Sequence, residues 1–343
     1  MSDRVFYLDG LRVFAILAVI IVHVTCMFYT RSGLDNWYAA CAYGSFSRWC
    51  VPVFCMISGA LFLNKRDLLL KDLYLHYIKR IVIAFVFWSS VYVILYSTHP
   101  FMIKSFVGEV IHGHYHLWFL YMICGLYIMM PIFRYIFANK AILRYYLSVS
   151  FVVAFFIPFV FDLSHSFGIM ENFIERIEFG YSQMNLQLFL GYSTYFLLGG
   201  VFRAYTFTPR QRSILYIAGI ACGLLIWVLT SLINKHRANA VNETFYCYTG
   251  LLVCFLSVSV FVFAKYSKCF ERISRTMMTR ISNLVFGVYL VHVIILDNIM
   301  RVLSDIRISA WIVIPLISLC VFIISLFLVW LLRKFVPYAK YIL

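Results

Sequence analysis

Charged residues are scarce in this sequence, and acidic residues are the scarcest of them. Only 13% of the 343 residues are Asp, Glu, Lys or Arg, whereas soluble domains carry about a quarter. Hydrophobic residues make up 64% of the chain and aromatic residues 19%. This composition excludes an ordinary soluble domain and predicts an integral membrane protein.

The chain also lacks any stretch rich in Pro, Gly or Ser that would separate domains, and no internal repeat is evident. We therefore expect a single transmembrane domain over residues 1–343 and no separate soluble domain. The 10 cysteines show no spacing typical of a metal site or a disulfide framework. Cys41 and Cys50 are expected near the outer face, and whether they form a bridge is left open.

Long apolar segments are abundant, and ten of them are long enough to cross a bilayer. These are residues 8–29, 47–63, 81–97, 117–137, 146–161, 186–206, 214–233, 245–263, 283–303 and 310–332. We expect an all-α membrane protein of about ten transmembrane helices.

The net charge of +15 arises from 29 Lys and Arg against 14 Asp and Glu. The basic residues lie between the apolar segments, which argues against nucleic acid as a partner. If the N-terminus is cytoplasmic, 21 of the 29 basic residues lie on the cytoplasmic side. The excess predicts that both termini are cytoplasmic.

A basic segment separates the second and third apolar segments. Residues 64–80, NKRDLLLKDLYLHYIKR, alternate basic and apolar residues in a helical pattern, which predicts an interfacial helix. Most basic residues of this segment are explained by contacts with anionic lipid headgroups. For Lys79 and Arg80, at the mouth of a span, binding of a phosphorylated cofactor is the alternative reading.

Arg12 and His23 lie eleven residues apart in the first apolar segment. On a helix this spacing makes about three turns, so both side chains share one face, separated by about 16 Å of rise. Ionisable groups inside a membrane are costly and mark functional sites. Either residue alone has an ordinary structural explanation, but the pair on one face favours function. Asp9 is expected to pair with Arg12.

Further polar residues interrupt later apolar segments. Ser58 and Gly59 follow Arg48 in a segment where close helix packing or a break around a ligand is expected. His112, His114 and His116 alternate as zinc ligands can, but no carboxylate or cysteine nearby completes a set, so no metal is expected.

His116 and Trp118 begin a span and are suited to binding a sugar through hydrogen bonding and stacking. Tyr289 and His292 place another imidazole in a late span, five residues before Asp297. They are either an interior polar pair or part of a cavity that contains His23.

Four short motifs in this order resemble the acyltransferase 3 family of integral membrane acyltransferases. They are Arg12 followed by His23, FCMISG at 54–59, HLWFL at 116–120 and YLVH at 289–292. The resemblance is greatest to bacterial surface-polysaccharide O-acetyltransferases of the enterobacterial common antigen type. Family members tend to have Arg-x-x-Arg near the third span. Here Lys79 and Arg80 follow His76, so the first Arg is absent.

The resemblance implies transfer of an acetyl group from cytoplasmic acetyl-CoA to a sugar hydroxyl in the bacterial inner membrane. The acceptor would be a surface polysaccharide or its undecaprenyl-linked precursor. His23 would act as general base or briefly carry the acetyl group, with Arg12 guiding the thioester. Ser58, Lys79 and Arg80 would also contact the cofactor. The predicted acceptor contacts are Arg48, His116, Trp118, Tyr289 and His292.

Two alternatives to acetyl transfer remain open from the sequence. The polar spans are compatible with a flippase for polyprenyl-linked oligosaccharide, although no matching pair of interrupted segments or repeat supports it. A transferase of succinyl or another acyl group differs from an acetyltransferase only in the shape of its cavity.

Overall fold

The computed structural model describes residues 5–29, 34–65, 70–96, 102–186, 189–234, 242–303 and 308–343. Within these ranges every regular element is a helix, which confirms the predicted all-α fold. The α-helices are α1 (Phe6–Cys26), α2 (Leu34–Ser47), α3 (Cys50–Phe62), α4 (Leu70–Asp72), α5 (Lys79–Tyr96), α6 (Ile103–His112), α7 (Trp118–Ile128), α8 (Met130–Ala138), α9 (Lys140–Ser150), α10 (Ile157–Phe167), α11 (Glu171–Gln183), α12 (Tyr192–Ala204), α13 (Pro209–Asn234), α14 (Leu251–Tyr266), α15 (Arg275–Val302), α16 (Ala310–Phe335) and α17 (Ala339–Ile342).

Short helical turns connect several of these elements. Two are π-helical, η1 (Leu73–Ile78) and η3 (Phe151–Phe156), and they join neighbouring α-helices without a break. Three are 3₁₀ turns, namely η2 (Tyr115–Leu117), η5 (Thr244–Tyr246) and η6 (Cys269–Arg272).

By length and composition, eight helices of the described residues are able to cross a membrane. They are Phe6–Cys26, Asn36–Phe62, Leu70–Tyr96, Lys140–Phe167, Pro209–Asn234, Thr244–Tyr266, Arg275–Val302 and Ala310–Phe335. The pair Tyr115–Ile128 and Met130–Ala138, bent by 55°, raises the number to nine if it counts as one span. The chain is a multi-pass membrane protein, whereas ten spans and cytoplasmic termini stay predictions.

Two predicted segments take a different form in the structure. The apolar segment at 186–206 contains helix α12, whose 13 residues are fewer than the roughly 20 that a span needs. The predicted interfacial helix is not a separate element over its described part, because Leu70–Tyr96 forms one continuous helical run through η1. Arg66 of that segment lies outside the described residues.

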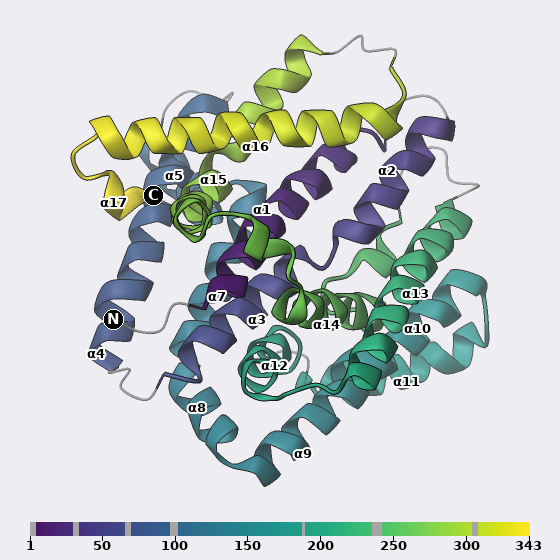
Figure 1. Ribbon diagram of the computed structural model, residues 1–343. Coiled ribbons are helices and arrows are strands. Elements are labelled where there is room, and N and C mark those ends of the chain that lie inside the picture. The colour runs from purple at the N-terminus through teal and green to yellow at the C-terminus, as the bar shows by residue number, and fades with distance from the viewer. Residues whose placement is uncertain are drawn as a thin grey trace.

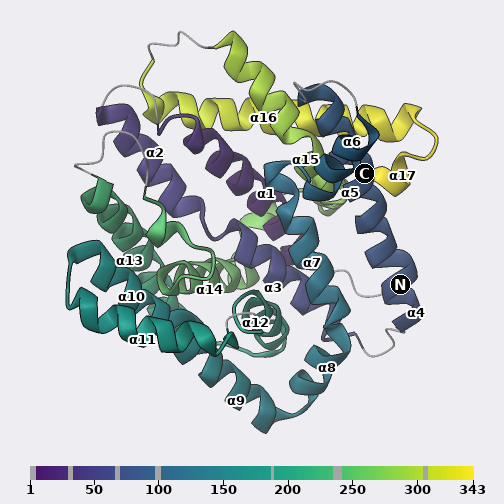
Figure 2. The ribbon, with the colours of Figure 1, turned by 180° about the vertical axis from the view of Figure 1, so that it is seen from behind.

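Helix α1 lies in the interior of the molecule. It contacts α2, α3, α14, α15 and α16, which surround it in Figure 1. Ala15, Ile16, Ile20 and Val24 are fully buried, as expected for a helix that is apolar on most sides. The helical hairpin of α10 and α11 instead lies at the edge of the molecule in both views (Figures 1 and 2). The residues of α1 therefore face protein over much of their length.

Two glycines bring α12 against α3. A Cβ atom added at Gly59 would lie 1.7 Å from the carbonyl oxygen of Phe196, and one at Gly199 would lie 1.9 Å from that of Met56. Only glycine permits backbones to approach this closely. The contact sets the position of the carboxyl end of α12, which carries Arg203.

The two cysteines considered for a bridge are both buried. Cys41 lies in α2 and Cys50 begins α3, and each is a free thiol in the structure.

Candidate active site

A cavity of about 750 Å³ lies between α1, α3, α5, α7 and α15. Figure 2 shows α7 beside α3 and α5. Seven of the ten predicted site residues line the cavity, although they come from distant parts of the chain. These seven are Arg12, His23, Ser58, Arg80, His116, Trp118 and Tyr289. The remaining three, Arg48, Lys79 and His292, do not line it.

The cavity has two chemically different ends, which α1 connects. Arg12 lies at one end and His23 at the other, because eleven residues of helix span about 16 Å along the axis. The prediction that these two side chains share one face toward one interior space is confirmed. We call the two ends the basic end and the imidazole end.

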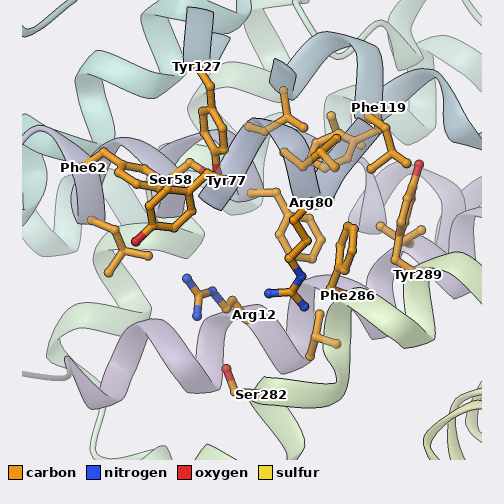
Figure 3. Close-up of a pocket in the computed structure, with 18 of the residues that line it drawn as sticks. Arg12, Ser58, Phe62, Tyr77, Arg80, Phe119, Tyr127, Ser282, Phe286 and Tyr289 are labelled. Carbon is orange, nitrogen blue, oxygen red and sulfur yellow. The ribbon is translucent and has the colours of Figure 1, made fainter. Parts of the chain in front are cut away.

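The basic end is lined by Arg12, Lys65, Arg80 and Arg203. Figure 3 shows Arg12 and Arg80 directing their guanidinium groups into the same open space from different helices. Within the described chain no Asp or Glu lines the cavity. Four cations in a partly enclosed space form a site suited to an anion, and phosphate groups in particular bind Arg in a bidentate manner.

Asp9 pairs with Arg12 but does not itself line the cavity. An Asp9 Oδ1 atom lies 3.7 Å from Arg12 Nη1 and accepts a hydrogen bond of 2.9 Å from Ser282 Oγ. Asp9 itself is buried, so its charge offsets part of the cost of placing Arg12 inside the protein. The predicted pairing of Asp9 with Arg12 is confirmed.

The other arginines of the basic end are anchored by backbone oxygens. Arg203 Nη1 donates to the carbonyl oxygen of Ala60 at 2.8 Å, and Arg80 Nη2 donates to Leu343 O at 2.6 Å. Lys265 Nζ donates to the carbonyl oxygens of Phe202, Arg203 and Tyr205 and so caps the end of α12. These contacts hold Arg203 beside the cavity.

Lys79 differs from its neighbour Arg80. Its side chain is exposed and outside the cavity, because adjacent residues on a helix point in directions about 100° apart. Of this predicted pair, only Arg80 lines the cavity, and a cofactor contact of Lys79 stays a prediction.

A pair of hydroxyl groups, from Ser58 and Tyr127, also lines the cavity. Ser58 Oγ and Tyr127 OH lie 3.4 Å apart, and Figure 3 shows both side chains grouped with Phe62 and Tyr77 across the open space from Arg12. The apolar residues Phe54, Phe119 and Ile123 also line the cavity. A hydroxyl pair can donate hydrogen bonds to a carbonyl oxygen.

The imidazole end gathers three histidines from three elements. The ring centroid of His23 lies 6.4 Å from that of His116, at the start of α7, and 5.2 Å from that of His292, in α15. Tyr289 OH donates a hydrogen bond to the backbone oxygen of His116 and joins α15 to the turn η2. Tyr289 therefore belongs to the cavity that contains His23, whereas His292 contacts the ring of His23 without lining that cavity.

His292 is part of this group but not of the cavity wall. Its side chain is fully buried, and its Nδ1 atom lies 2.7 Å from the carbonyl oxygen of Tyr289. His292 does not line the cavity, and its ring contacts those of His23, His116 and Tyr289, so its contact with the acceptor stays a prediction. Asp297 accepts a hydrogen bond of 2.6 Å from Tyr96 OH.

His114 extends the imidazole group toward the loop that precedes α7. Its Nδ1 atom lies 3.0 Å from His116 Nδ1, and its ring stacks on Tyr92. Burial lowers the pKa of His114 below its ordinary value, although the charge of Asp297 opposes this effect. Among the described residues no group of three or more His, Cys, Asp or Glu is arranged to hold a metal ion.

Arg48 lies elsewhere than predicted. It occupies the break between α2 and α3 inside the candidate span Asn36–Phe62, and not the outer end of a span that starts at residue 47. Its Nη2 atom lies 3.2 Å from Glu243 Oε1, and its guanidinium packs 4.3 Å from the ring centroid of Tyr246. Arg48 therefore supports the cavity from outside.

Arg48 does not line the cavity, but it packs against Tyr248, which does. The guanidinium of Arg48 lies 5.7 Å from the Tyr248 ring centroid, and Tyr248 lines the cavity and stacks on Trp118 at 5.9 Å. The two rings are inclined by only 26°. They form an aromatic surface beside His23 and His116.

The sequence did not indicate three cavity residues. Arg203 is one of 29 Lys and Arg, and Tyr127 and Tyr248 are single aromatics in a chain with 25 tyrosines. The only signal near Arg203 was its place at the end of an apolar segment.

A cavity with cations at one end and imidazoles at the other, inside a multi-pass helical protein, is typical of a membrane enzyme that acts on an anionic ligand. Residues 5–334 match the family model described as an acyltransferase domain, the acyltransferase 3 family. The chain belongs to this family, as the motifs predicted. Comparisons with curated proteins and with solved structures gave no match.

Proposed function

We propose that this protein is an O-acetyltransferase of the bacterial inner membrane. It moves an acetyl group from cytoplasmic acetyl-CoA to a sugar hydroxyl of a surface polysaccharide or its undecaprenyl-linked precursor. Family membership supports acyltransferase activity. The observation that carries the proposal further is that one cavity contains both the cation cluster around Arg12 and the imidazole of His23.

The basic end fits the phosphates of the donor. CoA carries several phosphate charges, and Arg12, Arg80 and Arg203 supply guanidinium groups that bind phosphate in a bidentate manner. The excess of Lys and Arg on the side of the N-terminus of α1 supports a cytoplasmic position for this end. The cavity volume of about 750 Å³ is in the ordinary range for a small-molecule site.

The thioester then extends along the cavity toward His23. Ser58 and Tyr127 line the same cavity and supply hydroxyl groups that can donate hydrogen bonds to polar atoms of the bound donor. Trp118 and Tyr248 offer a stacking surface for the acceptor sugar beside His23.

His23 is the proposed catalytic base. It takes the proton of the sugar hydroxyl as that oxygen attacks the thioester carbon, the carbon–sulfur bond breaks, and the proton passes to the leaving thiolate. In the covalent alternative a His23 nitrogen attacks first, CoA leaves, and the sugar oxygen then removes the acetyl group from the imidazole.

Labelled acetyl-CoA distinguishes these two routes. Purified protein mixed with the donor and no acceptor retains label on His23 in the covalent route, above the level of a His23→Ala control. Label at the level of that control supports direct transfer.

Mass spectrometry of surface glycans with and without the protein tests the function itself. We expect loss of one acetyl mass per modified sugar with glycan amount and length unchanged. A difference of another acyl mass identifies a different donor. Depletion of the glycan with its modification intact contradicts the proposal and indicates a flippase.

A further inference from the structure

We propose that His292 is a positioning residue that orients the imidazole of His23. Its Nε2 atom accepts the ring N–H of His23, and this bond determines which nitrogen of His23 presents a lone pair to the cavity. The inference rests on the proposed function, since it assigns His23 as the reacting group.

The proton position on His292 follows from its backbone contact. Nδ1 lies 2.7 Å from the carbonyl oxygen of Tyr289, and because a carbonyl oxygen only accepts, Nδ1 carries the proton. In a neutral imidazole the other nitrogen then has the lone pair. Nε2 of His292 is therefore an acceptor.

This acceptor is buried without a partner. In the described part of the chain no hydrogen bond reaches His292 Nε2, and the residue is 0% exposed. Leaving a buried acceptor unpaired costs roughly 1–3 kcal/mol, so a donor is expected when the site is assembled. The arrangement points to a ring that moves into bonding distance.

His23 is the nearest of the histidine rings that contact His292 and line the cavity. Its centroid lies 5.2 Å from that of His292, and the two rings are inclined by 43°. Hydrogen bonds of catalytic groups are often long without substrate and tighten when substrate binds. A rotation of the His23 ring brings its N–H to His292 Nε2 while its second nitrogen remains on the cavity.

His116 is the competing donor. Its centroid lies 5.3 Å from that of His292 at an angle of 85°, and its Nε2 atom is also buried without a partner in the described residues. However, His116 Nδ1 is already held by His114 Nδ1 at 3.0 Å. His116 is therefore fixed by other contacts, whereas no such contact holds the ring of His23 in the described structure.

A neutral partner suits this position. The role is that of the third member of a catalytic triad, which holds the base in one tautomer. A carboxylate in the same place would be an unpaired buried charge, which costs far more than a neutral acceptor. His292 supplies the acceptor without the charge.

The test compares His292→Leu with His292→Gln. Leucine removes the acceptor, whereas the side-chain amide oxygen of glutamine retains one. We expect His292→Leu to lower kcat by about tenfold to a hundredfold, a part of the usual contribution of a general base, with the KM for acetyl-CoA unchanged. His292→Gln should recover much of this loss.

Solid-state NMR of protein with ¹⁵N-labelled histidine gives a readout independent of activity. With CoA bound, the ring nitrogens of His23, assigned through His23→Ala, should show one tautomer in the wild type and in His292→Gln, but a mixture in His292→Leu. Leu296→Ala, which alters a fully buried residue one turn away, is the control for damaged packing and should keep one tautomer.

Three results would overturn the proposal, two of them in the His292 variants. One is a single His23 tautomer in His292→Leu, and the other is an equal loss of kcat in the leucine and glutamine variants. A change confined to the His116 resonances would also contradict it. If the wild type transfers no acyl group, the proposed function fails, but the NMR result still decides whether His292 orients His23.

Discussion

The two ends of the cavity are built in different ways. At the basic end, Arg12, Arg80 and Arg203 come from three helices, and Arg80 and Arg203 donate hydrogen bonds to backbone oxygens. At the imidazole end, the rings of His23, His116, Tyr289 and His292 contact one another in a buried group. The first arrangement suits binding of a flexible anion, and the second suits precise orientation of a reacting group.

This difference predicts that substitutions at the two ends of the cavity affect different kinetic constants. A change at the imidazole end should lower kcat, because it affects the step in which bonds break and form. A change at the basic end should mainly raise the KM for acetyl-CoA, because it weakens contacts that ground state and transition state share.

His23→Ala is expected to have the largest effect. Removing a general base lowers kcat by about a hundredfold to ten-thousandfold, while binding of CoA at the other end of the cavity should change little. Transfer of labelled acetyl groups and calorimetric titration with CoA measure the two quantities. Equal insertion into membranes is the control, and activity above a tenth of the wild type would remove His23 from this role.

Arg12→Lys should cause the next largest loss. Lysine retains the charge near Asp9 but loses planar bidentate recognition of phosphate, so we expect the KM for acetyl-CoA to rise by roughly tenfold. Steady-state kinetics at several donor concentrations provide the measurement. Wild-type kinetics would mean that Arg12 serves only to anchor α1.

Arg203→Gln and Lys79→Gln form a matched pair. Each removes one positive charge, but only Arg203 lines the cavity. We expect a severalfold increase in the KM for acetyl-CoA for Arg203→Gln, because one charged hydrogen bond is lost, and almost none for Lys79→Gln. Equal effects of the two variants would show that the cations act through the general surface charge and not through this cavity.

Trp118→Ala tests the aromatic surface. Loss of stacking should raise the KM for the acceptor by about twofold to tenfold, the range expected of one aromatic contact. The KM for acetyl-CoA should not change, and Trp118→Phe should recover part of the loss. A change in donor affinity alone would place the acceptor elsewhere.

The smallest effect is expected from the pH dependence of stability at His114. Its folded-state pKa lies below the ordinary value of 6.5, so the unfolded chain binds protons more readily and stability falls as pH decreases below about 6.5. Thermal unfolding in detergent between pH 7 and pH 5.5 should show a shallower decrease for His114→Gln than for the wild type. Parallel curves for the two proteins would contradict the prediction.

The arrangement of the polar residues of α1 could be predicted, because all of them lie on one helix. Asp9, Arg12 and His23 are related by helical periodicity alone, so their pairing and shared face follow from their spacing. The short motifs that contain His116 and Tyr289 also marked residues of the cavity.

Contacts between distant helices could not be predicted in this way. Arg203 reaches the cavity because Gly59 and Gly199 bring α12 and α3 into backbone contact, and nothing in a single helix encodes that register. Arg48 was predicted at the end of a span, but it lies inside the span Asn36–Phe62. The helix before Arg48 contains Ala, Ser and Gly and lowers the mean hydropathy of this span to 1.3. The predicted segment 47–63 therefore omits the weakly apolar half of that span.

The most direct test of the central claim is an experimental structure of the protein with CoA bound in a lipid bilayer mimic. We predict that the phosphates contact Arg12, Arg80 and Arg203 and that the sulfur atom lies beside His23, within the cavity that also contains Ser58 and Tyr127. CoA bound outside this cavity, or with its sulfur directed away from His23, would contradict the account.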